Sequence, residues 1–158
     1  QAIFDLLLQN IERFRDEAHS QHIRFRHLGR KDRLPQGLLH ALEGLEKETA
    51  HYTDFNVQLC LDYGGKDELL RAVNRVLKKR IRSIDEMRFA GYLDSADIPD
   101  VDLVIRTSGE QRLSGFMPLQ SAYAELYFAS VHFPDFTAKE LHKALEEYSQ
   151  RQRRFGGG

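Results

Sequence analysis

The apolar positions in the first third of the chain change from helical spacing to alternation and back again. Apolar residues recur at helical spacing over residues 2–20, which predicts a helix with one continuous apolar stripe. The run 23–28 alternates between apolar and basic residues and predicts a strand that ends at Gly29. Pro35 suits the first turn of a second helix, whose buried stripe is predicted to consist of Leu38, Leu42 and Leu45.

The remainder of the chain repeats this alternation of helices and short strands. Further strands are predicted at residues 56–61, 101–105 and 126–131. Further helices are predicted to begin near Gly65, Ser83, Pro118 and Thr137. The inward-facing residues are predicted to be Leu69, Val73, Val76 and Leu77 in the third helix and Leu141, Leu145 and Tyr148 in the last. Because helices that alternate with short buried strands are typical of a parallel sheet, we expect a single-domain α/β fold over residues 1–158.

The composition is that of a globular domain with balanced charge. The chain has 158 residues, of which 41% are hydrophobic, so it can bury a core. The 23 Lys and Arg residues nearly cancel the 24 Asp and Glu residues, which excludes a polyanion binder that relies on bulk charge. No apolar stretch is long enough to cross a membrane. The single cysteine, Cys60, excludes an internal disulfide framework and is compatible with a reducing compartment.

The loop after the predicted strand 101–105 carries candidate phosphate-binding residues. In parallel sheets, ligands bind beyond the carboxyl ends of the strands, and Arg106 lies at such an end, with Arg112 and Ser114 in the same loop. Two guanidinium groups, a hydroxyl and glycine-flanked amides can hold phosphate oxygens. The alternative is a solvated loop whose arginines pair with Glu110, and the spacing alone leaves both interpretations open.

Glu125 is a charged residue among apolar neighbours at the start of the next predicted strand. Because burial of an unpaired carboxylate is costly, Glu125 should meet either a divalent cation such as Mg²⁺ or a nearby arginine. The seven histidines show no metal-binding spacing, and the sequence contains no hydrolytic nucleophile constellation.

The start of the first predicted helix is apolar on almost every side. Such a helix is normally buried, so it belongs either to the core or to the wall of an apolar ligand channel. Periodicity alone favours core packing.

Two segments in the second half of the chain form a specific signature. Residues 102–116 read DLVIRTSGEQRLSGF and residues 120–128 read QSAYAELYF. Shorter matches lie at 62–68 (DYGGKDE), 134–136 (PDF) and 153–157 (RRFGG). Together these motifs resemble those of the cis-prenyltransferases, the undecaprenyl diphosphate synthase family, and the similarity in arrangement covers the whole chain. The resemblance implies a parallel sheet flanked by helices, as in undecaprenyl diphosphate synthase.

The resemblance implies a Mg²⁺-dependent chain elongation. An allylic diphosphate such as farnesyl diphosphate would be extended by isopentenyl diphosphate units with new cis double bonds. The implied product is a polyprenyl diphosphate such as undecaprenyl diphosphate, which serves the synthesis of a cell-wall lipid carrier. A homodimer in the cytoplasm is also implied, with transient membrane contact for product release and no nucleic-acid partner.

The resemblance also implies roles for individual residues. Arg106, Arg112 and Ser114 match the positions that hold the isopentenyl diphosphate head, and Glu125 matches a carboxylate that helps to bind Mg²⁺. Arg154 and Gly156 lie in the basic tail 150–158, which resembles a segment that crosses the dimer interface and closes the partner's site. The implied product tunnel is lined by Ile3, Leu6, Leu7, Ile23 and Phe25, which reverses the preference for plain core.

The sequence departs from the family pattern at several points. Asp62 and Lys66 stand where the family usually has Asn and Arg, and residues 117–119 replace an apolar-aromatic run. The family's first strand, with its Asp-Gly-Asn-Arg-Arg-Trp-Ala loop and essential aspartate, is not found in this chain, which begins at Gln1. We therefore expect these 158 residues to be inactive alone.

A different class of function is a non-catalytic partner subunit of a heteromeric cis-prenyltransferase. Such partners tend to lose the diphosphate arginines and the metal carboxylate. The presence of Arg106, Arg112, Ser114 and Glu125 favours the catalytic type.

Overall fold

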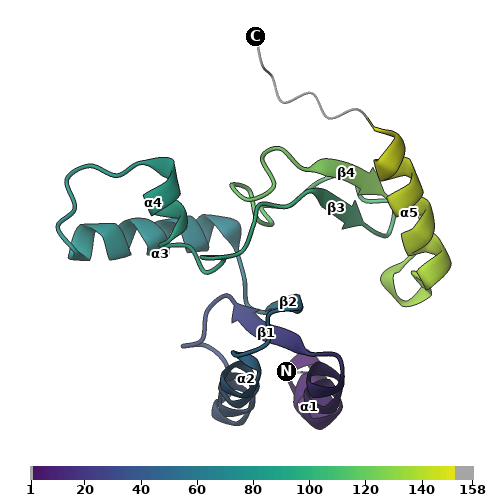
Figure 1. Cartoon of the computed structure of the whole chain (residues 1–158), viewed down its shortest axis with the longest axis horizontal. Coiled ribbons are helices and arrows are strands. Elements are labelled where there is room, and N and C mark those ends of the chain that lie inside the picture. The colour runs from purple at the N-terminus through teal and green to yellow at the C-terminus, as the bar shows by residue number, and fades with distance from the viewer. Residues whose placement is uncertain (1, 152–158) are drawn as a thin grey trace. The chain divides into compact units, whose positions relative to one another are not determined.

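The computed structural model describes residues 2–151, and the chain divides into two compact units, 1–95 and 96–158 (Figure 1). Each unit contains one two-stranded parallel sheet. Parallel strands accompanied by helices, with α2 between β1 and β2 in the chain, confirm the predicted α/β class. The assignment of all 158 residues to a single domain stays a prediction.

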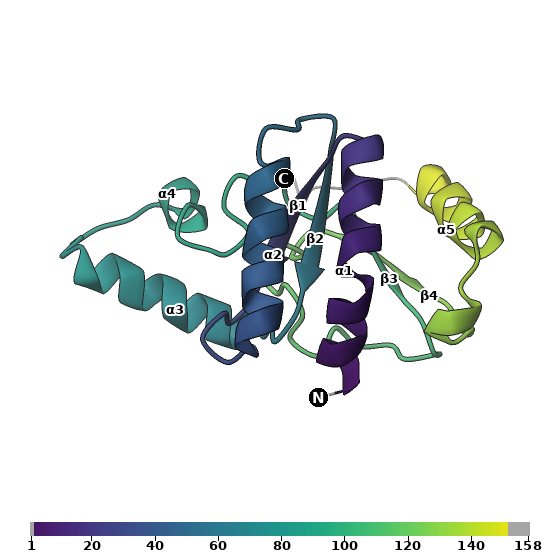
Figure 2. The ribbon, with the colours of Figure 1, turned by 90° about the horizontal axis from the view of Figure 1, so that it is seen from below.

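The first unit contains four helices and two strands among the described residues. They are α1 (Ala2–Ser20), β1 (Ile23–Leu28), α2 (Gln36–Thr49), β2 (Phe55–Cys60), α3 (Gly65–Lys78) and α4 (Glu86–Ala90). β1 and β2 run parallel, with Ile23 opposite Phe55 and Leu28 opposite Cys60. Helices α1 and α2 contact each other and lie side by side over one face of this sheet (Figure 2).

The core of the first unit forms between these two helices and β1. The predicted α2 stripe is confirmed, since Leu38, Leu42 and Leu45 are each at most 1% exposed. Thr49, at the end of α2, accepts a hydrogen bond from the Phe25 amide (3.0 Å) and donates one to the Leu45 carbonyl (2.7 Å). This buried hydroxyl therefore connects the last turn of α2 to the middle of β1.

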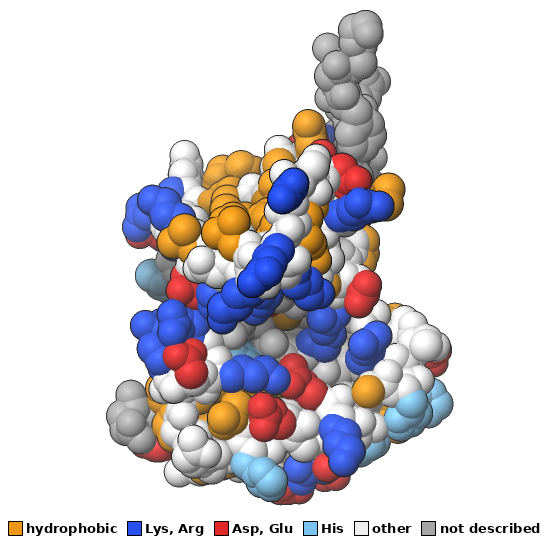
Figure 3. Space-filling model, turned by 90° about the vertical axis from the view of Figure 1, so that its left-hand side faces the viewer, with side chains coloured by type: hydrophobic (Ala, Val, Ile, Leu, Met, Phe, Trp, Pro, Cys, Tyr) orange, Lys and Arg blue, Asp and Glu red, His pale blue; other side chains and the backbone are white. Residues whose placement is uncertain are grey.

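Helix α3 confirms only part of its predicted inward face. Val76 is buried as predicted, together with Gly65, Glu68 and Ala72, whereas Val73 and Leu77 are 42% and 63% exposed. Hydrogen bonds to the Glu68 carboxylate hold this face inward. Figure 3 shows that hydrophobic side chains lie beside Lys and Arg side chains on the surface of one face.

The second unit contains two strands, one 3₁₀ turn and one helix among the described residues. They are β3 (Leu103–Arg106), β4 (Glu125–Phe128), η1 (Phe133–Asp135) and α5 (Ala138–Gln150). The parallel register places Leu103 opposite Glu125 and Arg106 opposite Phe128. Within α5, Ala144 is buried while Leu141 and Leu145 are 41% and 46% exposed, so the predicted inward face is wrong for both leucines.

Two local predictions are corrected by the backbone hydrogen bonds. Residues 118–124 form successive turns rather than a helix, because amides such as that of Ala124 bond to the carbonyl three residues earlier (Ser121). Helix α4 begins at Glu86 and is capped by Asp85, which accepts from the Arg88 amide. The sequence predicts that this helix begins near Ser83, and the structure places its start three residues later.

Within the described residues 2–151, no helix combines the length and apolar character that a bilayer crossing requires.

Candidate active site

A pocket of about 530 Å³ lies beyond the carboxyl end of β3. Arg106 is the last residue of this strand and lines the pocket. The remaining lining residues are Ile105, Thr107, Ser108, Glu110, Phe133 and Phe136. Within the described part of the chain Arg106 has no ion-pair partner, so its guanidinium can bind an anion without first breaking a salt bridge.

Backbone hydrogen bonds fix the loop that forms the pocket wall. The Ser108 amide donates to the Val131 carbonyl (2.7 Å), and the Gly109 amide donates to the Ala129 carbonyl (2.9 Å). Both residues have positive φ angles, 68° for Ser108 and 67° for Gly109. Nothing would contact a Cβ on Gly109 within 4 Å, so the backbone angle, not lack of space, explains the glycine.

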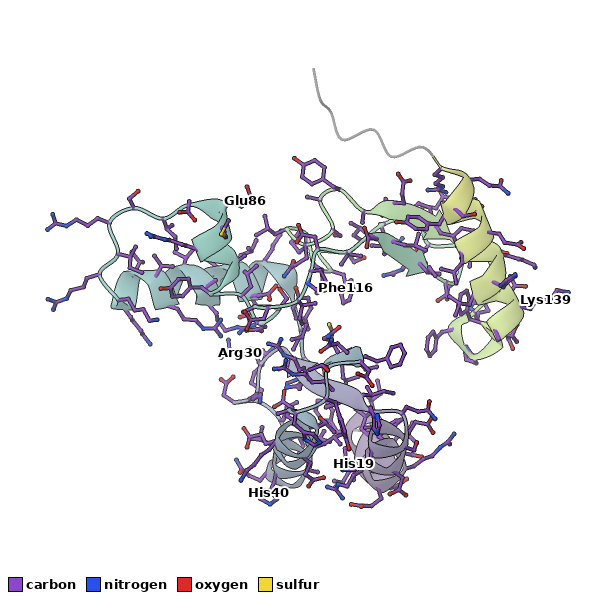
Figure 4. All side chains as sticks on the ribbon, viewed as in Figure 1. His19, Arg30, His40, Glu86, Phe116 and Lys139 are labelled. Atoms are coloured by element: carbon purple, nitrogen blue, oxygen red, sulfur yellow. The ribbon has the colours of Figure 1, made fainter. Side chains whose placement is uncertain are left out.

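The structure does not bring all three predicted diphosphate residues into this pocket. Arg112 lies in the same loop but pairs with Glu110, and its side chain is 63% exposed. Ser114 is also exposed, with a φ of 51°, and does not line the pocket. Phe116, labelled in Figure 4, follows in the same long loop between β3 and β4.

Arg112 therefore forms the salt bridge of the alternative interpretation, whereas phosphate binding by Arg106 stays a prediction. An exposed ion pair is worth at most about 1 kcal/mol. A doubly charged diphosphate can therefore replace Glu110 as the partner of Arg112 at small cost.

Glu125 lies at the amino end of β4 and has an arginine partner. Its Oε2 atom accepts a hydrogen bond from Arg151 Nη1 (2.9 Å), and the same nitrogen donates to the Leu126 carbonyl (2.9 Å). Arg151 also pairs with Glu147. Of the two predicted partners of Glu125, a divalent cation or an arginine, this structure contains the arginine.

Among residues 2–151 there is no group of three or more His, Cys, Asp or Glu side chains that could hold a metal ion. Mg²⁺ requires oxygen ligands in near-octahedral geometry, and the carboxylate of Glu125 is neutralised by Arg151.

The first unit contains an apolar pocket of about 250 Å³ between α1, α2 and the sheet. Nine of its eleven lining residues are apolar, and the two polar ones are Glu17 and Gln58. Helix α1 contributes Leu7, Ile11, Phe14 and Ala18 to the wall. A pocket of this composition suits a hydrocarbon chain because apolar surface gains about 25 cal/mol per Å² on leaving water.

The predicted tunnel residues divide between this pocket and the surface. Leu7, Ile23 and Phe25 line the pocket. Ile3 and Leu6 are not among its lining residues, and their side chains are 66% and 59% exposed. The predicted tail residues Arg154 and Gly156 lie outside the described residues.

Sequence reasoning assigned no role to several residues of the pocket beyond β3. Ser108, Phe133 and Phe136 line this pocket. Ser108 and Phe136 lie in motifs that carry the resemblance, but neither was given a role of its own. A signal for Ser108 was present, since it directly follows a strand end and precedes a glycine. No sequence pattern indicated Phe133, because the turn after β4 brings this side chain to the pocket.

A buried polar network at the start of α3 was also not predicted from the sequence. Glu68 is 1% exposed and accepts hydrogen bonds from the Tyr63 hydroxyl (2.6 Å) and the Asp94 amide (2.8 Å). Burial and this hydrogen bond raise the pKa of Tyr63, so it remains a donor. Asp94 in turn accepts a bidentate pair from Arg71 (2.5 and 2.6 Å).

The ion pairs of Asp94 make this network sensitive to acid. Burial opposes its ionisation, but hydrogen bonds from Arg71 and Arg75 outweigh burial and lower the pKa of the carboxyl. The resulting stabilisation is present above the ordinary aspartate pKa and is lost as the pH falls through the lowered value.

Arg30 extends the network to the loop after β1. It pairs with Asp67 of α3 at 3.2 Å (Figure 4). Burial raises the pKa of the nearby Cys60 thiol to about 11, which keeps it protonated and unreactive.

These features define an α/β protein with a cationic pocket at a strand end and a separate apolar pocket. Residues 1–156 match the protein family described as "Putative undecaprenyl diphosphate synthase". The chain belongs to this prenyltransferase family.

Individual relatives agree with this assignment. The chain is 42% identical over 155 residues to an isoprenyl transferase of Aquifex aeolicus (strain VF5), covering 98% of this chain and 67% of that protein. Two crystal structures each have a TM-score of 0.87 and 32% identity to this chain. One is a probable undecaprenyl diphosphate synthase from Campylobacter jejuni, with 98% of this chain and 73% of that chain covered. The other is lavandulyl diphosphate synthase from Lavandula x intermedia in complex with dimethylallyl diphosphate, with 99% and 72% covered.

The comparisons confirm the predicted family, the fold class and the enzyme class of prenyltransferase.

Proposed function

We propose that the protein elongates an allylic diphosphate with isopentenyl diphosphate to form a polyprenyl diphosphate. The observation that carries the proposal is the pocket beyond β3, in which Arg106 has no ion-pair partner among the described residues. A guanidinium offers parallel N–H donors that match two oxygens of a phosphate group. Arg106, assisted by Arg112 and Ser114 from the same loop, would hold the diphosphate of isopentenyl diphosphate.

In this proposal the two arginines act by positioning. Condensation requires the double bond of isopentenyl diphosphate to lie close to the allylic carbon, and fixed geometry lowers the barrier of such a bimolecular step. Since isopentenyl diphosphate keeps its diphosphate during condensation, Arg106 orients it and does not assist a leaving group. Proton loss completes the step, and the described residues suggest no base for it.

The apolar pocket of the first unit would receive the growing hydrocarbon chain. Each methylene that leaves water contributes about 0.8 kcal/mol, and the wall formed by Leu7, Ile23 and Phe25 is apolar. Ile3 and Leu6 extend the apolar surface of α1 toward its start and are proposed as further contacts of a long product. Undecaprenyl diphosphate is the proposed product, for use in synthesis of a cell-wall lipid carrier.

The proposal is tested by product analysis with the full-length protein. We expect incubation with farnesyl diphosphate, labelled isopentenyl diphosphate and Mg²⁺ to give a linear polyprenyl diphosphate whose length is read by chromatography. Incubation with dimethylallyl diphosphate alone is the second arm. A branched product in that arm would mean that the enzyme catalyses a different condensation and not elongation. Absence of any condensation product in both arms would contradict the proposal.

Ala18→Phe is expected to shorten the product. Ala18 lines the apolar pocket and is 4% exposed, so a phenyl group there fills space that the growing chain would occupy. Ala50→Phe is the matched control because Ala50 is exposed at the end of α2 and does not line the pocket.

Product length and thermal unfolding are measured for both variants. Overpacking can cost about 1–3 kcal/mol, and Ala18→Val supplies a smaller change if the phenylalanine variant unfolds. An unchanged product length in a folded, active Ala18→Phe enzyme would show that the chain grows elsewhere.

Magnesium dependence is a further part of the proposal, with Glu125 as a contributing carboxylate. Glu125→Gln is then expected to raise several-fold the Mg²⁺ concentration that gives half-maximal activity, because it removes a hard anionic oxygen. Arg151→Ala is the control, since it breaks the same ion pair but retains the carboxylate. If Glu125→Gln and the wild type need the same Mg²⁺ concentration for half-maximal activity, Glu125 does not bind Mg²⁺ and serves only as the ion-pair partner of Arg151.

A cytoplasmic homodimer with transient membrane contact is also proposed, without a nucleic-acid partner. Its support is the resemblance of the tail 150–158, including Arg154 and Gly156, to a segment that closes a partner's site. Sedimentation of the full-length protein at micromolar concentration would measure the assembly.

A further inference from the structure

Ser108 lines the pocket beyond β3 and contacts His132, and the proposed function assigns no role to this serine–histidine pair. The Oγ atom of Ser108 lies 3.3 Å from Nδ1 of His132, within hydrogen-bond distance. Ser108 follows β3, His132 follows β4, and they are 24 residues apart in the sequence. Ser108 lines the pocket together with Arg106, so its hydroxyl lies at the same cavity as the cation that attracts an anion.

The backbone holds the two side chains together. Ser108 has a φ of 68°, a conformation that is uncommon for residues other than glycine and is often associated with function. The hydrogen bond that maintains it runs from the Ser108 amide to the carbonyl of Val131, the residue before His132 (2.7 Å). One contact therefore fixes both the strained turn and the start of the segment that carries the imidazole.

On the far side of the pair, His132 leads directly into the turn η1. Its carbonyl accepts a hydrogen bond from the Asp135 amide (2.9 Å). The next residue, Phe133, lines the pocket. The segment after β4 thus places an aromatic wall and an imidazole around Ser108.

We infer that the Ser108 hydroxyl binds the diphosphate of isopentenyl diphosphate and that His132 is a positioning residue that orients this hydroxyl. The inference rests on the proposed function, because it assigns further binding residues to the same site. A serine hydroxyl carries one proton to donate and two lone pairs to accept. Its usefulness to a phosphate oxygen depends on where that proton points.

The protonation of His132 decides the direction of the hydrogen bond. A neutral ring that is unprotonated at Nδ1 accepts the Ser108 proton, which turns the hydroxyl away from an anion. A ring that carries a proton on Nδ1, either as that neutral tautomer or as the cation, donates from Nδ1 to Oγ, and the hydroxyl proton is then free for a phosphate oxygen. The charged groups on these elements include Arg106 at the end of β3, the Glu110–Arg112 ion pair of the following loop and Asp135 of η1.

Because protonation of the ring always places a proton on Nδ1, binding of isopentenyl diphosphate is expected to strengthen as the pH is lowered from about 8 to 5. The KM for isopentenyl diphosphate is measured across this range at saturating allylic diphosphate. Ser108→Ala is expected to raise KM about tenfold at pH 6.5 and to flatten its pH profile, because the hydroxyl donor is lost.

Two variants of the histidine separate positioning from structure. His132→Ala removes the partner of the hydroxyl and is expected to raise KM about threefold. His132→Gln retains an N–H donor for Oγ without titrating, so it should restore a KM near the wild-type value and remove the pH dependence. A merely structural role predicts that both variants lower thermal stability and leave the pH profile unchanged.

The double variant Ser108→Ala/His132→Ala completes a cycle. If His132 acts through Ser108, the double variant has the KM of Ser108→Ala alone. Independent, multiplicative effects, or a wild-type pH profile in His132→Gln, would overturn the inference. A wild-type protein that does not use isopentenyl diphosphate would instead overturn the proposed function, so the two failures are distinguishable.

Discussion

Arg106→Ala is expected to lower kcat/KM for isopentenyl diphosphate by about two to four orders of magnitude. Hydrogen bonds to charged groups contribute about 1.5–3 kcal/mol each, a guanidinium can make two to a phosphate, and each 1.36 kcal/mol is a factor of ten. The free energy of unfolding should change little, because Arg106 has no ion pair to lose within the described residues. Steady-state kinetics and urea unfolding measure the two effects.

Two control variants sharpen this prediction. Arg106→Lys keeps the charge but loses the parallel donors, so its kcat/KM should lie between those of the wild type and the alanine variant. Lys139→Ala removes an exposed charge of α5 in the same unit and should leave kcat/KM unchanged (Figure 4). If Arg106→Ala and Lys139→Ala have the same small effect, the pocket beyond β3 is not the diphosphate site.

The position of Arg106 was predictable because it follows from topology. A buried apolar run ends at this residue, and the carboxyl end of a parallel strand is where ligands collect. Its difference from Arg112 was not predictable, because the pairing of Arg112 with Glu110 depends on turns that contain positive φ angles. Sequence spacing treats both arginines alike, whereas the loop conformation separates them.

The helix faces illustrate the same limit. In α2 the predicted leucine stripe is buried, and the one buried polar residue of the helix, Thr49, lies in its last turn with its hydroxyl hydrogen-bonded. In α3 the apolar residues Val73 and Leu77 predicted the wrong face, since the buried carboxylate of Glu68 lies on the other side. A periodicity count treats Glu68 as a solvent-facing residue and cannot include hydrogen bonds from residues 26 positions away.

The apolar start of α1 is a segment whose role the hydrophobic pattern alone cannot decide. Periodicity favoured core, and the resemblance favoured a tunnel wall. The structure places Leu7 at a pocket and leaves Leu6 largely exposed. Core and pocket wall have the same composition, so the cavity itself is needed to tell them apart.

Glu68→Ala is expected to produce the largest loss of stability among single substitutions in the first unit, about 3–5 kcal/mol. The carboxylate is 1% exposed and accepts from the Asp94 amide, the Ser95 amide (3.4 Å) and the Tyr63 hydroxyl. Each buried donor that loses its acceptor costs about 1–3 kcal/mol. Since whole domains are stable by about 5–15 kcal/mol, this is a large share of the total.

Glu68→Gln distinguishes lost hydrogen bonds from lost packing. The amide oxygen can still accept from the Asp94 amide, and the Tyr63 hydroxyl can rotate to accept from the new N–H group, so the expected loss is about 1–2 kcal/mol. Glu86→Gln, at an exposed position of α4, should stay within about 0.5 kcal/mol of the wild type. Urea unfolding should show a lower midpoint with an unchanged m-value for both Glu68 variants. Equal stability of Glu68→Ala and Glu86→Gln would mean that water replaces the carboxylate and that the network does not hold α3 in place.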